Sequence, residues 1–397
     1  MRKTSIAKVS MKKSLLAVSV AAFAMSAQAE DAATLYDAIA DGSADLTLRY
    51  RYEFVDQDGP LDNANASTLK TRVTYKTQTF EGLSGLLEFD NNSDVLTGDF
   101  NSTQNGKTDY AVVADPKYTE INQAYVDYAA PASTLLRVGR QRINLDNQRF
   151  VGGVAWRQNE QTFDAYTLVN KALPDTAVTL SYITNVNDIF GNNINGENHG
   201  ILHAHNSSLD LANVSAYGYL LNEISDTYGL RLNGKLAMDS AALMYALEYA
   251  TQEQDQANGY TADYMLAEIG GQVAGITATL GYELLGADDD GKGAFQTPLA
   301  TKHKFNGWAD KFLATPKDGL EDLYVSVSGK VISPKVTIAY HQFKADEGGA
   351  DYGNEIDFSI GQDFMEHYNV LLKYAHYSAD TYASDTDKIW LQLGANF

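Results

Sequence analysis

Arginine side chains are concentrated in one stretch of a chain that is otherwise strongly acidic. The whole sequence contains 30 Lys and Arg residues against 51 Asp and Glu residues, for a formal net charge of -21. The stretch 137–158 reverses this balance, with a single acid, Asp146, and five arginines: Arg137, Arg140, Arg142, Arg149 and Arg157. A guanidinium stays charged at any relevant pH and offers a fixed fork of donors that pairs carboxylates. The cluster therefore predicts a site that attracts anions.

Further basic side chains lie on the polar face of alternating segments elsewhere in the chain: Arg49, Arg51, Lys70, Arg72, Lys76, Arg231 and Lys373. A ring of cations in a narrow aqueous pore lowers the barrier for anions and raises it for cations. Each of these cations could instead pair with an acid of the same face, such as Glu53, Glu88, Glu248 or Glu283. For any single residue, pairing is the simpler interpretation. For the 137–157 cluster, where acids are scarce, we favour anion binding.

Enzymatic and nucleic-acid functions find little support in the residues. The chain has no cysteine, which excludes disulfides and thiol chemistry. Its acidic balance argues against nucleic acid as a partner, because phosphate binding needs clustered cations. The seven histidines lie outside any recognisable nucleophile motif: His199, His203, His205, His303, His341, His367 and His376. We therefore expect the protein not to be an enzyme.

Metal binding has two weak candidates. His203 and His205 share one face of a predicted strand, but two ligands are too few to define a metal site. Clustered carboxylates in the predicted external loops could hold Ca²⁺ or bridge to lipopolysaccharide: Asp56, Asp58, Asp94, Asp99, Asp288 to Asp290, Asp346, Glu347 and Asp351. Since none of these runs has EF-hand spacing, we favour solvated loops and expect no cofactor.

The elements that position these side chains are predicted to be long β-strands. Apolar and polar residues alternate along nearly the whole chain; in the first segment Leu48, Tyr50 and Tyr52 alternate with Arg49 and Arg51. The alternating runs last roughly 10–13 residues, which suits the ~9–11 residues that a tilted strand needs to cross a bilayer. Strands of a soluble sandwich, the alternative, average about 5–6 residues. The pattern predicts an all-β, antiparallel transmembrane barrel with its apolar rows facing lipid.

Counting the strands tests this prediction. Seventeen segments are clear: 44–56, 67–79, 83–92, 119–129, 134–143, 161–170, 177–187, 211–221, 226–237, 241–252, 261–271, 274–286, 320–331, 335–344, 353–364, 368–378 and 386–397. An even number is expected, with long loops on one side. A weaker segment at 199–207 restores that parity and makes 18 strands, with 16 as the alternative. The short connections then become periplasmic turns, among them Glu81–Gly82, Pro131–Ser133 and Gly271–Gln272.

The N-terminal segment reads as a secretory signal. Five basic residues precede the apolar stretch 15–25, and Ala27-Gln28-Ala29 is typical of a cleavage site. We therefore predict a signal peptide at 1–29, a short periplasmic segment at 30–43 and the barrel at 44–397. Residues 30–43 are too few for the N-terminal plug domain of an energy-coupled receptor. No later stretch approaches 18 consecutive apolar residues, so no transmembrane helix is expected.

Two segments resemble the alginate export family of outer-membrane barrels. The first runs from Gly139-Arg140-Gln141 through Arg149-Phe150 to Trp156-Arg157-Gln158-Asn159-Glu160-Gln161-Thr162-Phe163-Asp164, and the second from Thr297-Pro298-Leu299-Ala300 through His303 to Gly319-Leu320. The resemblance implies an 18-stranded barrel whose best-understood relatives export a polyuronate through an arginine-rich lumen. It also implies an arginine constriction at Arg137, Arg140, Arg142, Arg149 and Arg157, with the second segment as an external loop folding over the mouth.

The sequence thus predicts a porin of the Gram-negative outer membrane, for passive passage of small hydrophilic, preferentially anionic solutes. The alternative is a dedicated exporter of an acidic polysaccharide such as alginate. Its partners would be outer-membrane lipid, lipopolysaccharide and the anionic solute or polysaccharide. We expect the constriction to be lined by ten residues: Arg49, Arg51, Arg72, Arg137, Arg140, Arg142, Arg149, Arg157, Arg231 and Lys373. We expect the segment 143–159 to fold inward, because it is too long and polar for a simple turn.

Overall fold

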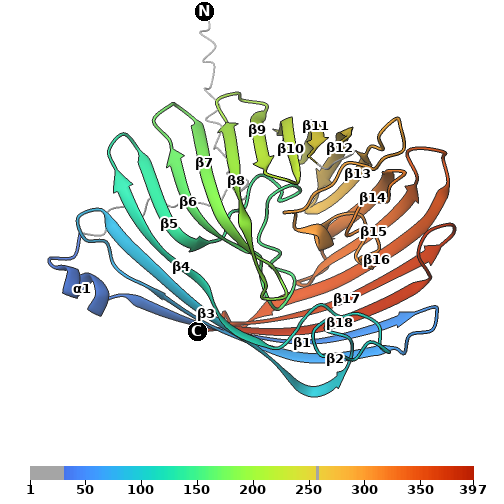
Figure 1. Cartoon of the computed structure of the whole chain (residues 1–397), viewed down its shortest axis with the longest axis horizontal. Coiled ribbons are helices and arrows are strands. Elements are labelled where there is room, and N and C mark those ends of the chain that lie inside the picture. Colours follow the sequence, from blue (N-terminus) through green and yellow to red (C-terminus); the bar gives the residue numbers. More distant parts are fainter. Residues whose placement is uncertain (1–30, 256–258) are drawn as a thin grey trace, which may run out of the picture.

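Eighteen antiparallel strands pair edge to edge until the first strand meets the last (Figure 1). The computed structural model describes residues 31–255 and 259–397, so the predicted signal peptide lies outside the described residues. Strand β1 (Ser43–Gln57) pairs on one side with β2 (Ala64–Lys76) and on the other with β18 (Thr386–Asn396). This closure leaves no unpaired sheet edge, as hydrocarbon requires. The predicted fold class and the count of 18 strands are confirmed.

The other strands follow in chain order: β3 (Leu83–Asp99), β4 (Tyr118–Ala130), β5 (Thr134–Gln141), β6 (Thr162–Asn170), β7 (Thr176–Asn187), β8 (Asn193–Asn206), β9 (Asn213–Leu221), β10 (Ser225–Ala237), β11 (Ala241–Gln254), β12 (Thr261–Val273), β13 (Ile276–Leu285), β14 (Leu320–Lys330), β15 (Lys335–Lys344), β16 (Asp351–Phe364) and β17 (Tyr368–Ala379). A short helix, α1 (Leu35–Ala40), precedes β1, and a 3-10 turn, η1 (Lys302–Lys304), lies between β13 and β14. The weak segment at 199–207 is a full strand, β8.

The sequence placed one turn wrongly. We predicted the connection between β12 and β13 at Gly271–Gln272, but both residues lie within β12 and pair with β11 and β13. The turn is formed by Ala274 and Gly275, with φ of 50° and 81°. A two-residue hairpin loop of type I′ needs a positive φ at both of its residues. Gly275 adopts the larger positive φ, which a residue without Cβ tolerates. Strand β3 also runs further than its predicted end at residue 92.

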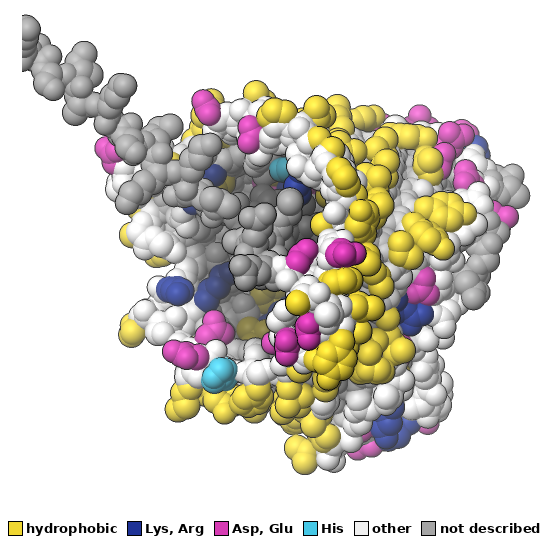
Figure 2. Space-filling view, turned by 90° about the vertical axis from the view of Figure 1, so that its left-hand side faces the viewer, with side chains coloured by type: hydrophobic (Ala, Val, Ile, Leu, Met, Phe, Trp, Pro, Cys, Tyr) yellow, Lys and Arg dark blue, Asp and Glu magenta, His cyan; other side chains and the backbone are white. Residues whose placement is uncertain are grey.

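The outer wall of the barrel is apolar. Alternate side chains point outward and remain exposed, for example Leu230 at 62 % and Ile269 at 54 %. Hydrophobic side chains cover the wall in Figure 2, while Lys and Arg side chains lie inside the opening on the side where α1 is located. In the described part of the chain, no helix is long and apolar enough to span a membrane. The exposed apolar rows around the closed barrel form the surface that faces lipid.

The inside of the barrel contains packed protein. Two long connections enter it, the β5–β6 loop (142–161) and the β13–β14 loop (286–319). Phe150 of the first packs against Tyr217, Tyr264 and Phe295, with ring centroids 5.1–5.7 Å apart. These aromatic contacts bury apolar surface within the lumen, so the hydrophobic core of this molecule lies around the loops.

Candidate constriction site

The two inner loops bind each other through their backbones. The Gly152 N–H donates to Leu299 O at 2.9 Å, and the Thr301 N–H donates to Gln148 O at 3.0 Å. The Gln161 side-chain amide donates to Gly152 O at 2.9 Å and to Leu299 O at 3.0 Å. The two motifs that are far apart in the sequence therefore form one unit inside the lumen.

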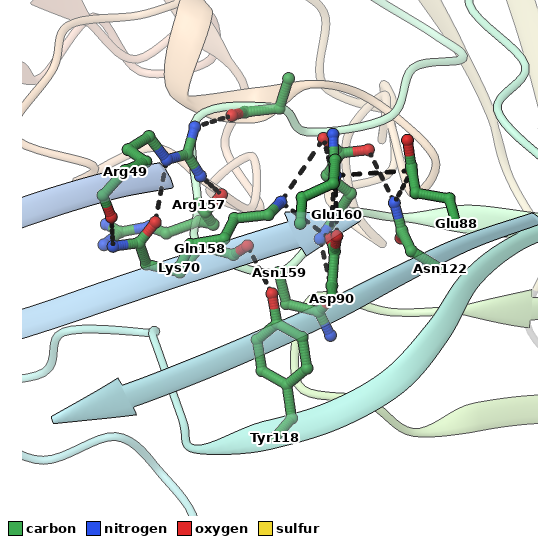
Figure 3. Close-up of polar contacts among 12 residues, drawn as sticks. Arg49, Lys70, Glu88, Asp90, Tyr118, Asn122, Arg157, Gln158, Asn159 and Glu160 are labelled. Carbon is green, nitrogen blue, oxygen red and sulfur yellow. Dashed lines mark hydrogen bonds and ion pairs between the residues drawn. The ribbon is translucent and has the colours of Figure 1, made fainter. Parts of the chain in front are cut away.

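Arg49 joins this unit to the wall of the barrel (Figure 3). It faces inward from β1, and its Nε donates to Gln158 Oε1 at 2.9 Å. Its other nitrogens donate to the backbone oxygens of Ala155, at 2.8 Å, and Arg157. Every partner of Arg49 is a neutral oxygen, and none of the ion pairs formed in the described part of the chain involves it. Its positive charge is therefore not cancelled by a directly contacting carboxylate.

Arg51 lies next to Arg49 on the inner face of β1 and is 1 % exposed. Its Nη2 donates to Gln392 Oε1 at 2.7 Å, and Nη1 is 3.7 Å from Asp115 Oδ2. The guanidinium lies 4.0 Å from the ring centre of Trp156. Its Nε has no hydrogen-bond partner. Arg51 thus keeps donor capacity that the surrounding protein does not use.

Glu160 is the acid at the centre of the basic cluster (Figure 3). It forms ion pairs with Arg142 and with two cations of β2, Arg72 at 2.8 Å and Lys70 at 3.7 Å. Burial alone would raise the pKa of the Glu160 carboxyl, but Arg142, Lys70 and Arg72 together lower it well below its ordinary value. Arg142 and Arg72 also pair with Glu88. Much of the cationic charge here is therefore matched by acid.

Arg157 connects β1 to the β13–β14 loop. One of its nitrogens lies 2.9 Å from Glu53 on β1, and another lies 2.9 Å from Asp310 in that loop. Lys388 of β18 also lies 2.9 Å from Asp310. All four side chains are at most 7 % exposed. Arg157 therefore fixes both loops to the wall at one point.

Arg149 and Arg231 lie toward the opposite wall. Arg149 Nε is 2.7 Å from Glu283 Oε1 on β13, and its Nη2 donates to Asn306 at 3.0 Å. Arg231 of β10 forms an ion pair with Glu248 of β11. Both arginines are buried and each has a carboxylate partner, as the pairing interpretation expects for single residues.

Lys373 occupies an aromatic cage that contains all three tryptophans of the chain. Its Nζ lies 3.7 Å from the ring centre of Trp308, 4.1 Å from Trp156 and 5.2 Å from Trp390. The Trp rings attract the ammonium through their electron-rich faces. The same Nζ lies 2.9 Å from His303 Nε2. The cage joins β17 and β18 to both inner loops.

His303 is held as a neutral imidazole by its two neighbours. Nε2 accepts from the Lys373 ammonium, so the ring proton is on Nδ1, which lies 2.6 Å from Asp310 Oδ1. Burial lowers the pKa of His303 to about 3; Asp310 opposes this shift and Lys373 adds to it. The contact with Asp310 is therefore a hydrogen bond from a neutral ring.

Two predicted constriction residues lie elsewhere. Arg137 pairs with Asp127 at 2.7 Å on the inner face of β5, close to the β4–β5 turn, and does not contact the inner loops through that pair. Arg140 points away from the lumen, because it is two residues beyond Val138, an outward side chain that is 48 % exposed. It pairs with Asp164 at 2.7 Å. Our prediction that Arg140 lines the pore was therefore wrong, because its side chain lies in the outward row of β5.

Arg142, another of the expected constriction residues, stands where the chain leaves the barrel wall. Strand β5 ends at Gln141, and Arg142 begins the inward loop. This change of direction brings Arg142 to Glu160 and Glu88 inside the barrel.

The histidine pair and the acidic loops bear on the metal predictions. His203 Nε2 lies 2.8 Å from Asp146 Oδ2, and His205 Nδ1 lies 3.0 Å from Ser215 Oγ. Ser215 also donates to Asp146 at 2.7 Å. Within residues 31–255 and 259–397, no three His, Asp or Glu side chains are grouped as metal ligands. Ca²⁺ binding at the external loops stays a prediction.

Several residues of the site were not assigned from the sequence. Glu160 and Asp310 stand within the two quoted motifs, but we considered only the cations there. Asp115, in the β3–β4 connection, accepts from the Gln158 N–H at 2.7 Å. The tryptophan cage could have been inferred from Trp390, a large aromatic residue in the polar row of the last strand. Trp156 and Trp308 in the two motifs give the same indication.

A closed 18-stranded barrel with an apolar outer wall and a charged interior defines a transmembrane β-barrel of the outer-membrane type. The comparisons agree. Residues 43–175 match the model of the alginate export family, which confirms the resemblance drawn from the first motif. No curated protein matches the chain.

Solved structures share the fold at low identity. Pseudomonas aeruginosa OpdK, crystallised with vanillate, matches with a TM-score of 0.75 and 15 % identity, over 90 % of this chain and 99 % of that one. Pseudomonas aeruginosa OccK9 (OpdG) matches with 0.74 and 13 %, over 91 % and 99 %. Acinetobacter baumannii OccAB4 matches with 0.71 and 13 %, over 90 % and 98 %. At these identities the likeness establishes the fold.

Proposed function

We propose that this protein is an outer-membrane channel for the passive passage of small hydrophilic, preferentially anionic solutes. The closed barrel, the lipid-facing apolar rows and the polar interior support the channel. Its partners are then outer-membrane lipid and lipopolysaccharide on the outside and the solute on the inside. Its place is the outer membrane of a Gram-negative cell.

The anionic preference rests on one observation, the state of Arg49 on β1. The Arg49 guanidinium donates only to neutral oxygens of Gln158, Ala155 and Arg157. These contacts lie inside the barrel, where the β5–β6 loop meets the wall. Guanidinium charge that no contacting carboxylate cancels favours anions over cations at a narrow aqueous passage. The fold neighbour OpdK was crystallised with vanillate, an aromatic carboxylate, which is consistent with this proposal.

Reversal potentials in planar bilayers test the proposal. With a KCl gradient across a bilayer that contains the purified protein, we expect chloride to be more permeant than potassium. A protein that inserts as a folded barrel and carries no current would overturn the channel. A current with equal or greater potassium permeability would overturn only the anionic preference.

We do not extend the proposal to export of an acidic polysaccharide. A polymer chain would have to displace the two inner loops, which are bonded to each other and to opposite walls. The interior also carries acids such as Glu160 and Asp310, which repel a polyanion once their cation partners move.

A further inference from the structure

A cavity of about 370 Å³ lies under the β13–β14 loop, against β12, β14 and β15. Its lining includes Ser326 and Thr337, which are close to the β14–β15 turn, so it lies on the turn side of the loop. Phe305 and Tyr324 provide aromatic walls. A volume of this size accommodates a small organic molecule.

Most charged groups at this cavity are already paired. Arg231 is bound to Glu248 on the neighbouring strand. Asp322 accepts from His341, at 2.9 Å, and from Asn306, at 3.2 Å. These groups shape the cavity but have little capacity left for a ligand.

Lys304 and Glu268 differ from these groups, because both line the cavity and do not pair with each other. Glu268 accepts from Tyr324 through Oε1, and no described side chain donates to its second oxygen. Lys304 Nζ donates to Asn147 O at 2.9 Å, which leaves two of its three N–H groups available. One cavity therefore offers a free acceptor and a free cationic donor.

The shared cavity places Lys304 and Glu268 within reach of one ligand, and the two charges interact. Desolvation lowers the pKa of Lys304 and the charge of Arg231 lowers it further, while Glu268 opposes the shift. Both side chains line the same cavity, and within the described residues no ion pair forms between them. Lys304 Nζ is also 5.4 Å from the Phe305 ring centre, so the cation borders the aromatic wall.

We propose that this cavity binds a small aromatic solute that carries both an ammonium and a carboxylate group. The ammonium donates to Glu268, the carboxylate accepts from Lys304, and the ring lies between Phe305 and Tyr324. This inference rests on the proposed channel function and goes beyond it, because the ligand at this point of the lumen is a zwitterion and not a simple anion.

Calorimetric titration of the detergent-solubilised, full-length protein tests the inference. The probes are 4-(aminomethyl)benzoate, benzoate and benzylammonium, which share one ring and differ only in charged groups. We expect the zwitterion to bind about tenfold tighter than either singly charged probe, equivalent to about 1.4 kcal/mol. Equal affinity for benzoate and the zwitterion would overturn the inference.

Two variants test which side chain binds the ammonium of the ligand and which binds its carboxylate. Glu268→Gln should remove the advantage of the zwitterion over benzoate and leave benzoate binding unchanged. Lys304→Gln should remove the advantage over benzylammonium and leave benzylammonium binding unchanged. Asp290→Asn and Lys292→Gln make the same charge changes in an exposed ion pair of the same loop, 3.1 Å apart, and serve as controls. Equal losses in the control variants would contradict the assignment.

This test is separable from that of the channel itself. Binding is read by calorimetry without any current, whereas the proposed function is read as conductance. A conducting barrel that binds the three probes equally refutes zwitterion binding in the cavity and leaves the channel proposal intact. A barrel that prefers the zwitterion but carries no current supports the cavity and refutes the channel.

Discussion

Arg149 and Glu283 meet inside the barrel although 134 positions separate them in the sequence, with Nε and Oε1 2.7 Å apart. Arg149 belongs to the β5–β6 loop and Glu283 to the wall strand β13. The Arg149 side chain is 3 % exposed and the Glu283 side chain 4 %, so the pair is shielded from water. Removing one partner of such a pair is costly, because the other charge stays buried.

Substituting Arg149 by Gln should therefore release the part of the β5–β6 loop around residue 149 from β13. We expect the free energy that holds the loop against β13 to fall by on the order of 3 kcal/mol, while the barrel strands stay paired. Single-channel conductance in planar bilayers should rise. Arg137→Gln is the matched control, because it breaks a comparable Arg–Asp pair on the wall. A similar rise in both variants would show that the effect is not specific to the loop.

Arg49 and Arg140 should affect ion selectivity differently. Arg49 faces the lumen without a carboxylate partner, whereas Arg140 faces outward and pairs with Asp164. Arg49→Gln should shift the reversal potential in a KCl gradient toward potassium, and Arg140→Gln should leave it unchanged. If Arg140→Gln gave the larger shift, our placement of both side chains would be wrong.

The burial of His303 beside Lys373 should make attachment of the β13–β14 loop sensitive to acid. The pKa of His303 is lowered to about 3 in the folded protein, from an ordinary value near ~6.5. Because the pKa is lower in the folded state, the full stabilisation is present above pH ~6.5, the pKa of the unfolded state. The free energy of unfolding then decreases as pH drops from ~6.5 toward ~3. Between pH ~7 and ~4.5 the loss reaches up to about 2.7 kcal/mol.

Hydrogen exchange of the β13–β14 loop measures this effect. Protection of the loop should decrease over that pH range in the natural protein. In His303→Asn the decrease should be smaller, because the titrating group is gone. His367→Asn, at an exposed turn, is the control and should retain the full pH dependence.

Gly139 should be essential for barrel assembly. Its φ is +127°, and a Cβ there would lie 2.2 Å from the Ala124 carbonyl oxygen. Gly139→Ala should cost at least about 1–3 kcal/mol of backbone strain. Gly271→Ala meets no atom within 4 Å and is the matched control. The fraction of heat-modifiable, folded protein on a gel measures assembly, and equal fractions would refute the prediction.

Alternation along the strands made most of the fold predictable. In β1 and β10 the outward rows are apolar and the inward rows charged, because one row faces lipid and the other water. Parity then required the weak strand that the structure shows as β8. The turn at Ala274–Gly275 escaped prediction, because strand pairing is set jointly by both partners and the local pattern fits either position.

The site was predictable only as a list of residue types. Local periodicity can indicate that Arg49 faces inward, because its direction depends on the next few residues of its own strand. Periodicity cannot indicate that Glu160 forms ion pairs with three cations or that Lys373 lies in a cage of three tryptophans. It also cannot indicate that Arg149 pairs with Glu283. These contacts join loops to walls that are distant in the sequence. The sequence alone determined the barrel and its two faces, while only the tertiary structure decided which charges cancel, because pairing depends on distances that chain closure creates.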